Sequence, residues 1–95
     1  MEYTIEVNAA TNEHEYTVKV LDQSGSGPAV YTVTVTPEQL ATYGVEGVPV
    51  GTVLRHAFMF LLERENPSQI LSRFTLADIE RYFPEFREEI YNRCV

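Results

Sequence analysis

The sequence contains only one cysteine, Cys94, which lies next to the C-terminus. A single cysteine excludes an internal disulfide, which is typical of proteins from a reducing compartment. Long apolar runs are also missing, because the longest, residues 57–62, is far shorter than the ~20 residues of a membrane span. The first residues are acidic and favour a strand, unlike a secretory signal. We therefore predict a cytoplasmic protein that does not insert into a membrane.

Basic side chains are scarce in the first half of the chain. Up to Val48 there is one, Lys19, against seven acidic residues, whereas the remainder has six arginines and seven acids. The net formal charge is −7. Acidic surfaces repel phosphate groups, so we predict neither a nucleic-acid partner nor binding to anionic membranes. The 95 residues, 44% of them hydrophobic, fit a single domain. Within it we assign residues 1–36 to a sheet and 37–95 to a helical part.

One five-residue pattern occurs three times near the N-terminus. It reads YTIEV, YTVKV and YTVTV at residues 3–7, 16–20 and 31–35. Side chains alternate between the two faces of a strand, so each copy places tyrosine and two aliphatic residues on one face. The short connections favour an antiparallel meander. The sequence therefore predicts a three-stranded antiparallel sheet with one apolar face.

Helical periodicity dominates the second half. Residues 50–65 carry an apolar stripe with the spacing of a helix, which predicts a main helix there. Thr36 and Thr75 fit the N-caps of two short helices, and Pro84 predicts a break before the last one. Because the apolar face of the sheet needs a cover, we predict an α+β fold. The main helix would cover one face of the meander, and short C-terminal helices would follow.

Two segments carry a recognisable pattern, FLLERENPSQIL at residues 60–71 and FTLADIERYFPEF at 74–86. They resemble the C-terminal part of small, uncharacterised prokaryotic proteins with the pattern FLLERE…SIL…F…L…I…YFP. No activity is attached to that family, so the resemblance implies no catalytic residues. It implies a bacterial or archaeal, cytoplasmic origin.

The third strand presents an edge without the usual protection. In a meander it lies at the edge of the sheet, and its polar face carries only threonines, without the lysine, proline or bulge of most natural edges. The strand is therefore central, covered by a loop, or paired with a second subunit. The main helix also has a turn that is apolar nearly all round. We predict a non-catalytic protein-interaction module or a homodimer that associates through Tyr31, Thr32, Val33, Thr34, Val35, Met59 and Phe60.

The alternative is a small ligand-binding protein or an enzyme. Its pocket would lie between the sheet and the main helix, lined by Tyr3, Tyr16, Tyr31 and His56. Polar groups that converge in an apolar pocket are typical of such proteins. No motif in the chain carries identifiable chemistry, so we favour a protein without enzymatic activity and expect no cofactor.

Residues that bind metals or act as nucleophiles are isolated in this sequence. His14 is flanked by Glu13 and Glu15, but neighbours in a strand point alternately and cannot all reach one ion. Cys94 is one residue from the C-terminus and has no base near it in the sequence. We therefore predict no metal site and no catalytic residue, and a partner that is either a second copy of the chain or another protein.

Overall fold

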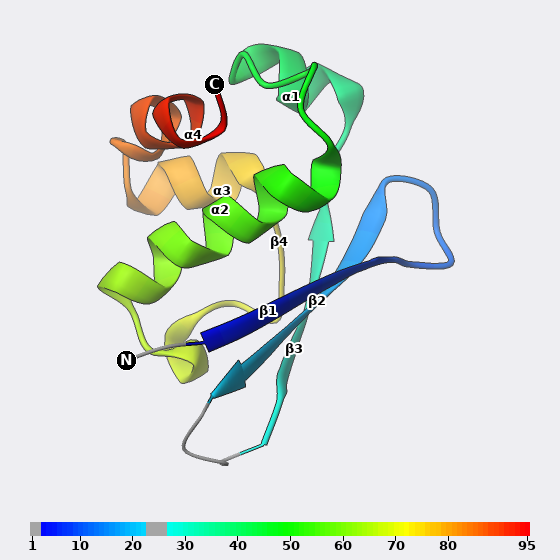
Figure 1. Ribbon diagram of the computed structural model, residues 1–95, viewed down its shortest axis with the longest axis vertical. Coiled ribbons are helices and arrows are strands. Elements are labelled where there is room, and N and C mark those ends of the chain that lie inside the picture. Colours follow the sequence, from blue (N-terminus) through cyan, green and yellow to red (C-terminus); the bar gives the residue numbers. More distant parts are fainter. Residues whose placement is uncertain (1–2, 23–26) are drawn as a thin grey trace.

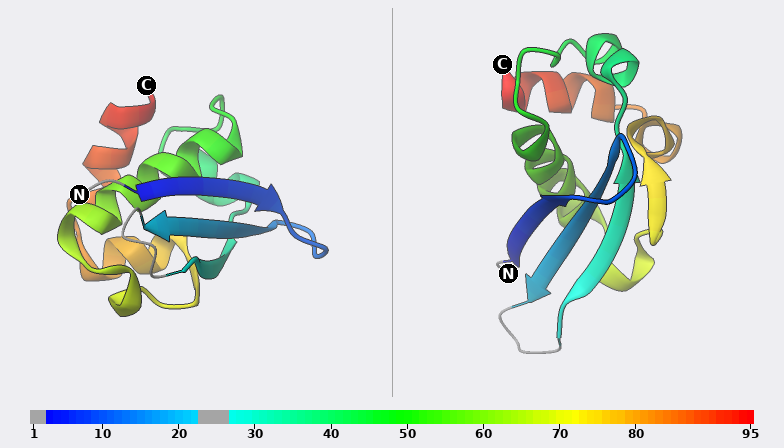
Figure 2. Two further views of the ribbon diagram at one scale, coloured as in Figure 1. Left: turned by 60° about the horizontal axis from the view of Figure 1, so that its bottom comes forward. Right: turned by 90° about the vertical axis from the view of Figure 1, so that its right-hand side faces the viewer.

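A computed structural model describes residues 3–22 and 27–95 of the chain. One sheet contains, in spatial order, β1 (Tyr3–Ala9), β2 (Glu15–Asp22), β3 (Ala29–Thr34) and β4 (Arg73–Thr75). The helices are α1 (Pro37–Thr42), α2 (Val50–Arg64), the short 3₁₀ helix η1 (Pro67–Gln69), α3 (Leu76–Tyr82) and α4 (Phe86–Cys94). Helices α2 and α4 lie on one side of the sheet, and the other side is uncovered (Figures 1 and 2). The predicted α+β class is confirmed.

The two faces of the sheet differ as the repeated pattern predicts. Val18 and Val33 are fully buried beneath α2, and Ile5 on the outermost strand is half-buried against the same core. The alternate residues Thr4 and Glu6 are exposed. The period-two placement of tyrosine and aliphatic residues is therefore confirmed.

A fourth strand corrects the predicted three-stranded topology. β4 pairs in parallel with β3, with Thr32 opposite Arg73 and Thr34 opposite Thr75. The N–H of Thr32 donates a hydrogen bond to the Ser72 carbonyl at 2.8 Å. The edge position of Tyr31–Val35 in a three-stranded meander is therefore wrong, and of the three alternatives for this strand the central position is confirmed. A three-residue strand is too short to show alternation, and its partner lies far away in the sequence, which is why the pattern did not reveal it.

The helices begin and end at the residues that favour such boundaries. The Thr36 hydroxyl accepts a hydrogen bond from the Gln39 N–H at 3.2 Å and caps α1. Thr75 and Asp78 cap α3 reciprocally, with each side chain accepting from the other residue's N–H. The chain leaves helical geometry around Pro84, between α3 and α4. These predicted boundaries are confirmed to within two residues.

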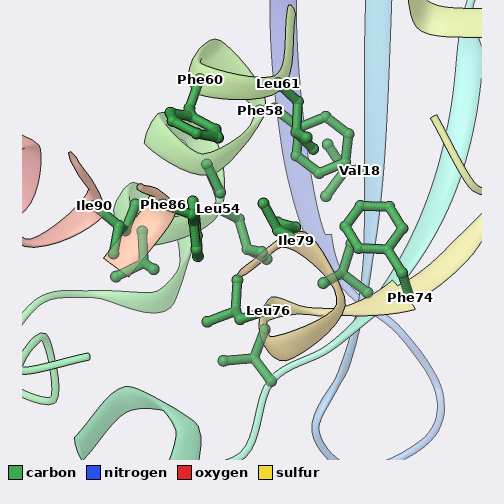
Figure 3. Packing of buried hydrophobic residues seen from close by; sticks show 14 of the residues in the cluster. Val18, Leu54, Phe58, Phe60, Leu61, Phe74, Leu76, Ile79, Phe86 and Ile90 are labelled. Atoms are coloured by element: carbon green, nitrogen blue, oxygen red, sulfur yellow. The ribbon is translucent and has the colours of Figure 1, made fainter. Parts of the chain in front are cut away.

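The core joins the sheet to the helices. The ring of Phe58 on α2 lies 5.3 Å from that of Tyr31 and 5.8 Å from that of Phe74, between centroids. On the other side of α2, the Phe60 ring lies 5.3 Å from the Phe86 ring on α4. Figure 3 shows Phe58, Phe60, Phe74 and Phe86 packed between α2, the sheet and the C-terminal helices. One continuous cluster of buried residues therefore holds both parts of the chain.

Candidate binding groove

A groove of about 340 Å³ opens between the C-terminal end of α2, the η1–β4 segment and α3. Its apolar floor consists of residues that are at most 9% exposed, namely Leu61, Ile70, Phe74 and Ile79. Figure 3 shows Leu61, Phe74 and Ile79 from the three elements that form it. Its volume is at the lower end of the range, ~300–1,000 Å³, of sites that hold small ligands or side chains.

Two large apolar side chains line the groove and yet remain exposed to solvent. Leu71 is 51% exposed and Tyr82 is 65% exposed. An apolar floor flanked by exposed apolar side chains is typical of a surface that binds another molecule. These two residues make the groove the strongest candidate site in the described part of the chain.

Hydrogen bonds to the sheet and within the segment fix the η1–β4 wall of the groove. The Tyr31 hydroxyl donates to the Pro67 carbonyl at 2.5 Å, and the Asn66 N–H donates to Gln69 Oε1 at 2.9 Å. The ladder between β3 and β4 holds the following residues. Because the segment is held at both ends, the groove exists before any ligand binds.

The polar residues of the groove are acidic or already engaged. Asp78 caps α3, and one of its oxygens lies 3.6 Å from the Arg81 guanidinium. Gln69 is bonded to the Asn66 backbone. Among residues 3–22 and 27–95, no hydrogen bond or ion pair involves the side chain of Glu65. The Glu65 carboxylate is therefore the acceptor that a basic group of a ligand can reach.

Most residues of the predicted interface are not accessible. Tyr31 is 3% exposed, Val35 is 2% exposed, and Val33 and Phe60 are fully buried. The prediction of an interface through Phe60 is wrong, because its ring packs against Phe83 and Phe86. Of the two helix residues, only Met59, which is 44% exposed, lies at the surface.

The structure does not bring the predicted pocket residues together. Tyr16 is opposite Ala9, six residues along β1 from Tyr3, so these two tyrosines are about 20 Å apart. His56 is two residues from Phe58, about 200° around α2, and therefore points away from the sheet. Fully buried side chains, including Leu54, fill the space beneath α2. The prediction of a pocket lined by Tyr3, Tyr16, Tyr31 and His56 is wrong for these reasons.

Tyr82 is not marked as a site residue by the sequence, because it lies on a regular helical pattern. Tyr82 continues the apolar stripe of α3, which is typical of a buried residue. Tyr82 and Phe83 are adjacent, however, and a short helix cannot bury two consecutive large side chains on one face. That excess of apolar residues at the end of α3 was the available signal.

The side chains whose pKa is shifted lie mainly where helices contact one another. Arg93 lies 2.8 Å from Glu63, and its hydrogen bond lowers the pKa of that carboxyl. Burial, and then a hydrogen bond to Glu80, raise the pKa of Tyr43 to about 12. Burial also raises the pKa of the Cys94 thiol, which keeps it protonated. These groups connect α1, α2, α3 and α4, so we assign them a structural role.

The described residues offer little for metal chemistry. Within residues 3–22 and 27–95, no group of three histidine, cysteine, aspartate or glutamate side chains is placed to hold a metal ion. Across the same residues, the helices are too short or too polar to cross a membrane. The cytoplasmic location stays a prediction.

Comparison with protein-family models, curated proteins and solved structures gives no significant match to this chain. The resemblance of residues 60–86 to prokaryotic proteins therefore stays an expectation from the sequence. The candidate function therefore rests on the geometry of the groove.

Proposed function

We propose that the protein is a non-catalytic interaction module, and that its groove receives a bulky apolar side chain of a partner protein. The observation that carries this proposal is the exposure of Leu71 and Tyr82 beside a buried apolar floor. Covering these two side chains removes apolar area from water, which is the main driving force of most protein association. Tyrosine is also among the residues that contribute most to interfaces.

The charge of the groove specifies the partner further. Glu65 and Asp78 line it, and the whole chain carries a net charge of −7. A lysine or arginine next to the apolar side chain of the partner can pair with Glu65. The acidic surface of this protein also accelerates association with a basic partner. The proposed ligand is therefore a peptide segment with a large apolar residue beside a basic one.

Selection from a displayed library of short random peptides tests this proposal. We expect the recovered peptides to combine a bulky apolar residue with a neighbouring lysine or arginine. Binding measured by fluorescence anisotropy should weaken by about fivefold or more in Leu71→Ser and Tyr82→Ala, because truncation of a central apolar contact costs over about 1 kcal/mol. Glu65→Gln should reduce the preference for the basic residue.

Val30→Ser is the matched control variant. Val30 is 52% exposed, almost the same as Leu71, but it lies on β3 and does not line the groove. We expect Val30→Ser to bind the peptides as the parent protein does. Failure to enrich any peptide, or equal binding by the parent and the Tyr82→Ala variant, would refute the proposal.

A further inference from the structure

β1 ends the sheet on the side away from the groove. It pairs with β2 along its whole length, and in the described part of the chain no strand lies on its other side. Residues 3–9 contain neither lysine nor proline, and their single charge, Glu6, is opposite Lys19 on β2. The usual devices that prevent strand addition are therefore weak at this edge.

The hydrogen-bond pattern shows which backbone groups face outward. The Ala10 N–H donates to the Glu15 carbonyl at 2.9 Å, so Ala10 directs its backbone toward the β2 side. In an antiparallel ladder such residues alternate, and Asn8 and Glu6 therefore also bond to β2. By the same alternation, Ile5, Val7 and Ala9 direct their N–H and C=O groups away from the sheet. Three donors and three acceptors thus lie along the open edge.

Helix α2 extends this edge into a broader surface. The helix turns by about 100° per residue, and Phe58 faces the sheet whereas Phe60 faces α4. The remaining arc, with Arg55 and Met59, lies between β1 and α4. Figures 1 and 2 show α2 running alongside β1. Met59, which is 44% exposed, lies on the solvent-facing side of this helix.

We propose that a second copy of the chain pairs with β1 in an antiparallel, two-fold arrangement centred on Val7. Val7 then lies opposite the partner's Val7, and Ile5 opposite the partner's Ala9. All three outward-facing residues find hydrogen-bond partners, and two sheets become one. The dimer depends on contacts that the groove does not share, because β1 and β4 are opposite edges of the sheet.

The charge of Glu6 selects this register. A two-fold axis at Glu6 would place its carboxylate directly opposite the partner's Glu6, which is destabilising. An axis at Ile5 would place Ala9 beyond the partner's β1, which begins at Tyr3. An axis at Val7 places Glu6 opposite the partner's Asn8, whose side-chain amide can donate to the carboxylate. The chain is therefore complementary to itself in this register.

Sedimentation equilibrium of the full chain, up to about 100 μM, tests the dimer, since a small interface of this kind is expected to bind in the micromolar range. We expect a mass that rises toward twice 10.8 kDa. Val7→Pro removes an outward N–H without removing a bond to β2, and should give a monomer with unchanged secondary structure by circular dichroism. Val7→Ala is the control, because it shortens the side chain and keeps the N–H, and should still dimerise.

A charge test then examines the register. Asn8→Asp places a carboxylate opposite the partner's Glu6 at two symmetric positions, and should raise the dissociation constant by about 2- to 30-fold. Adding Glu6→Gln to Asn8→Asp should return the dissociation constant to that of the parent protein.

A mass of one chain at every concentration overturns the proposal, as does a dimer that Val7→Pro leaves intact. If the double variant fails to recover, the Val7-centred register is wrong. Peptide binding by a monomeric Val7→Pro variant would leave the proposed function standing alone.

Discussion

Arg87 on α4 donates a hydrogen bond from Nε to Oε2 of Glu80 on α3 at 2.8 Å. The other oxygen of Glu80 accepts from the Tyr43 hydroxyl at 3.0 Å, and Arg87 also reaches the Thr42 carbonyl at 3.2 Å. One carboxylate therefore connects α3 with α4 and with the end of α1. Because these helices enclose the core on the side away from the sheet, the titration of Glu80 and Tyr43 should be visible in the stability of the whole protein.

Acid should destabilise the protein through Glu80 and Glu63. The hydrogen bond from Arg87 lowers the pKa of Glu80 from 4.5 in the folded state, and Arg93 lowers that of Glu63 in the same way. The stabilisation is complete above pH 4.5 and is lost as the pH falls through the lowered pKa. Thermal unfolding followed by circular dichroism at several pH values should show a shallower acid dependence for Glu80→Gln. Equal slopes for Glu80→Gln and the parent would contradict the assignment.

Alkaline conditions should reveal the raised pKa of Tyr43 as a loss of stability. Its pKa is raised to about 12 from 10.0, first by burial and then by the hydrogen bond to Glu80. The folded state therefore retains a proton that the unfolded state loses, and stability should fall as the pH rises from 10 toward 12. The ultraviolet absorbance of tyrosinate should show a late transition that Tyr43→Phe reduces, and the part that remains belongs to Tyr31, whose pKa burial also raises. A titration that Tyr43→Phe leaves unchanged would show that Tyr43 is not the late-titrating group.

Tyr31→Phe should loosen the wall of the groove. It removes the hydroxyl that donates to the Pro67 carbonyl at 2.5 Å, and should cost about 1 kcal/mol of unfolding free energy. Hydrogen exchange should accelerate at Gln69 and Ile70, because the Pro67 carbonyl then keeps only its hydrogen bond from the Ile70 N–H at 3.3 Å. Tyr16→Phe, on the neighbouring strand, is the control. Unchanged exchange in the η1 segment of Tyr31→Phe would mean that β4 alone holds this wall.

Phe60→Ala and Met59→Ala should differ strongly although the residues are adjacent. Phe60 is fully buried, so its truncation should cost about 3–5 kcal/mol of unfolding free energy in urea denaturation. Met59 is 44% exposed, and its truncation should change stability by less than about 1 kcal/mol. Similar losses for both variants would contradict the observed orientation of α2.

Two glycine substitutions should change stability in opposite directions. Gly44 has a φ of +72°, and a Cβ there would lie 3.1 Å from a ring carbon of Tyr91, so Gly44→Ala should destabilise by about 1–2 kcal/mol. Gly51, in the first turn of α2, has open space around it, and Gly51→Ala should stabilise by about 0.5 kcal/mol. Denaturant titrations of both variants measure the difference, and a stabilising Gly44→Ala would refute the argument.

The sequence specifies the local structure of this protein better than its long-range pairing. The repeated pattern correctly placed Val18 and Val33 in the core, and the capping residues Thr36 and Thr75 correctly located two helices. These features depend on residues that are close in the chain. The neighbour of β3 depends instead on Arg73–Thr75, a segment whose strand geometry arises only from contact with residues about 40 positions earlier.

The candidate site was less predictable than the fold for a related reason. Leu71 lies between η1 and β4, a segment that is held against β3, and no local pattern encodes that contact. Tyr82, at the end of α3, was marked only by the apolar residue that follows it. The predicted interface assumed that β3 ends the sheet. The predicted pocket assumed that a cavity separates the sheet from α2. The parallel strand and the packing of Phe58 remove both assumptions.

The late position of Arg73–Thr75 in the chain has a consequence for biosynthesis. When the first 35 residues leave the ribosome, β3 has no neighbour on its second side, and the threonine-rich strand stays open until some 40 further residues have been translated. We expect this interval to be the stage at which nascent chains associate wrongly, so that ending translation before Arg73 yields aggregates whereas the full chain folds.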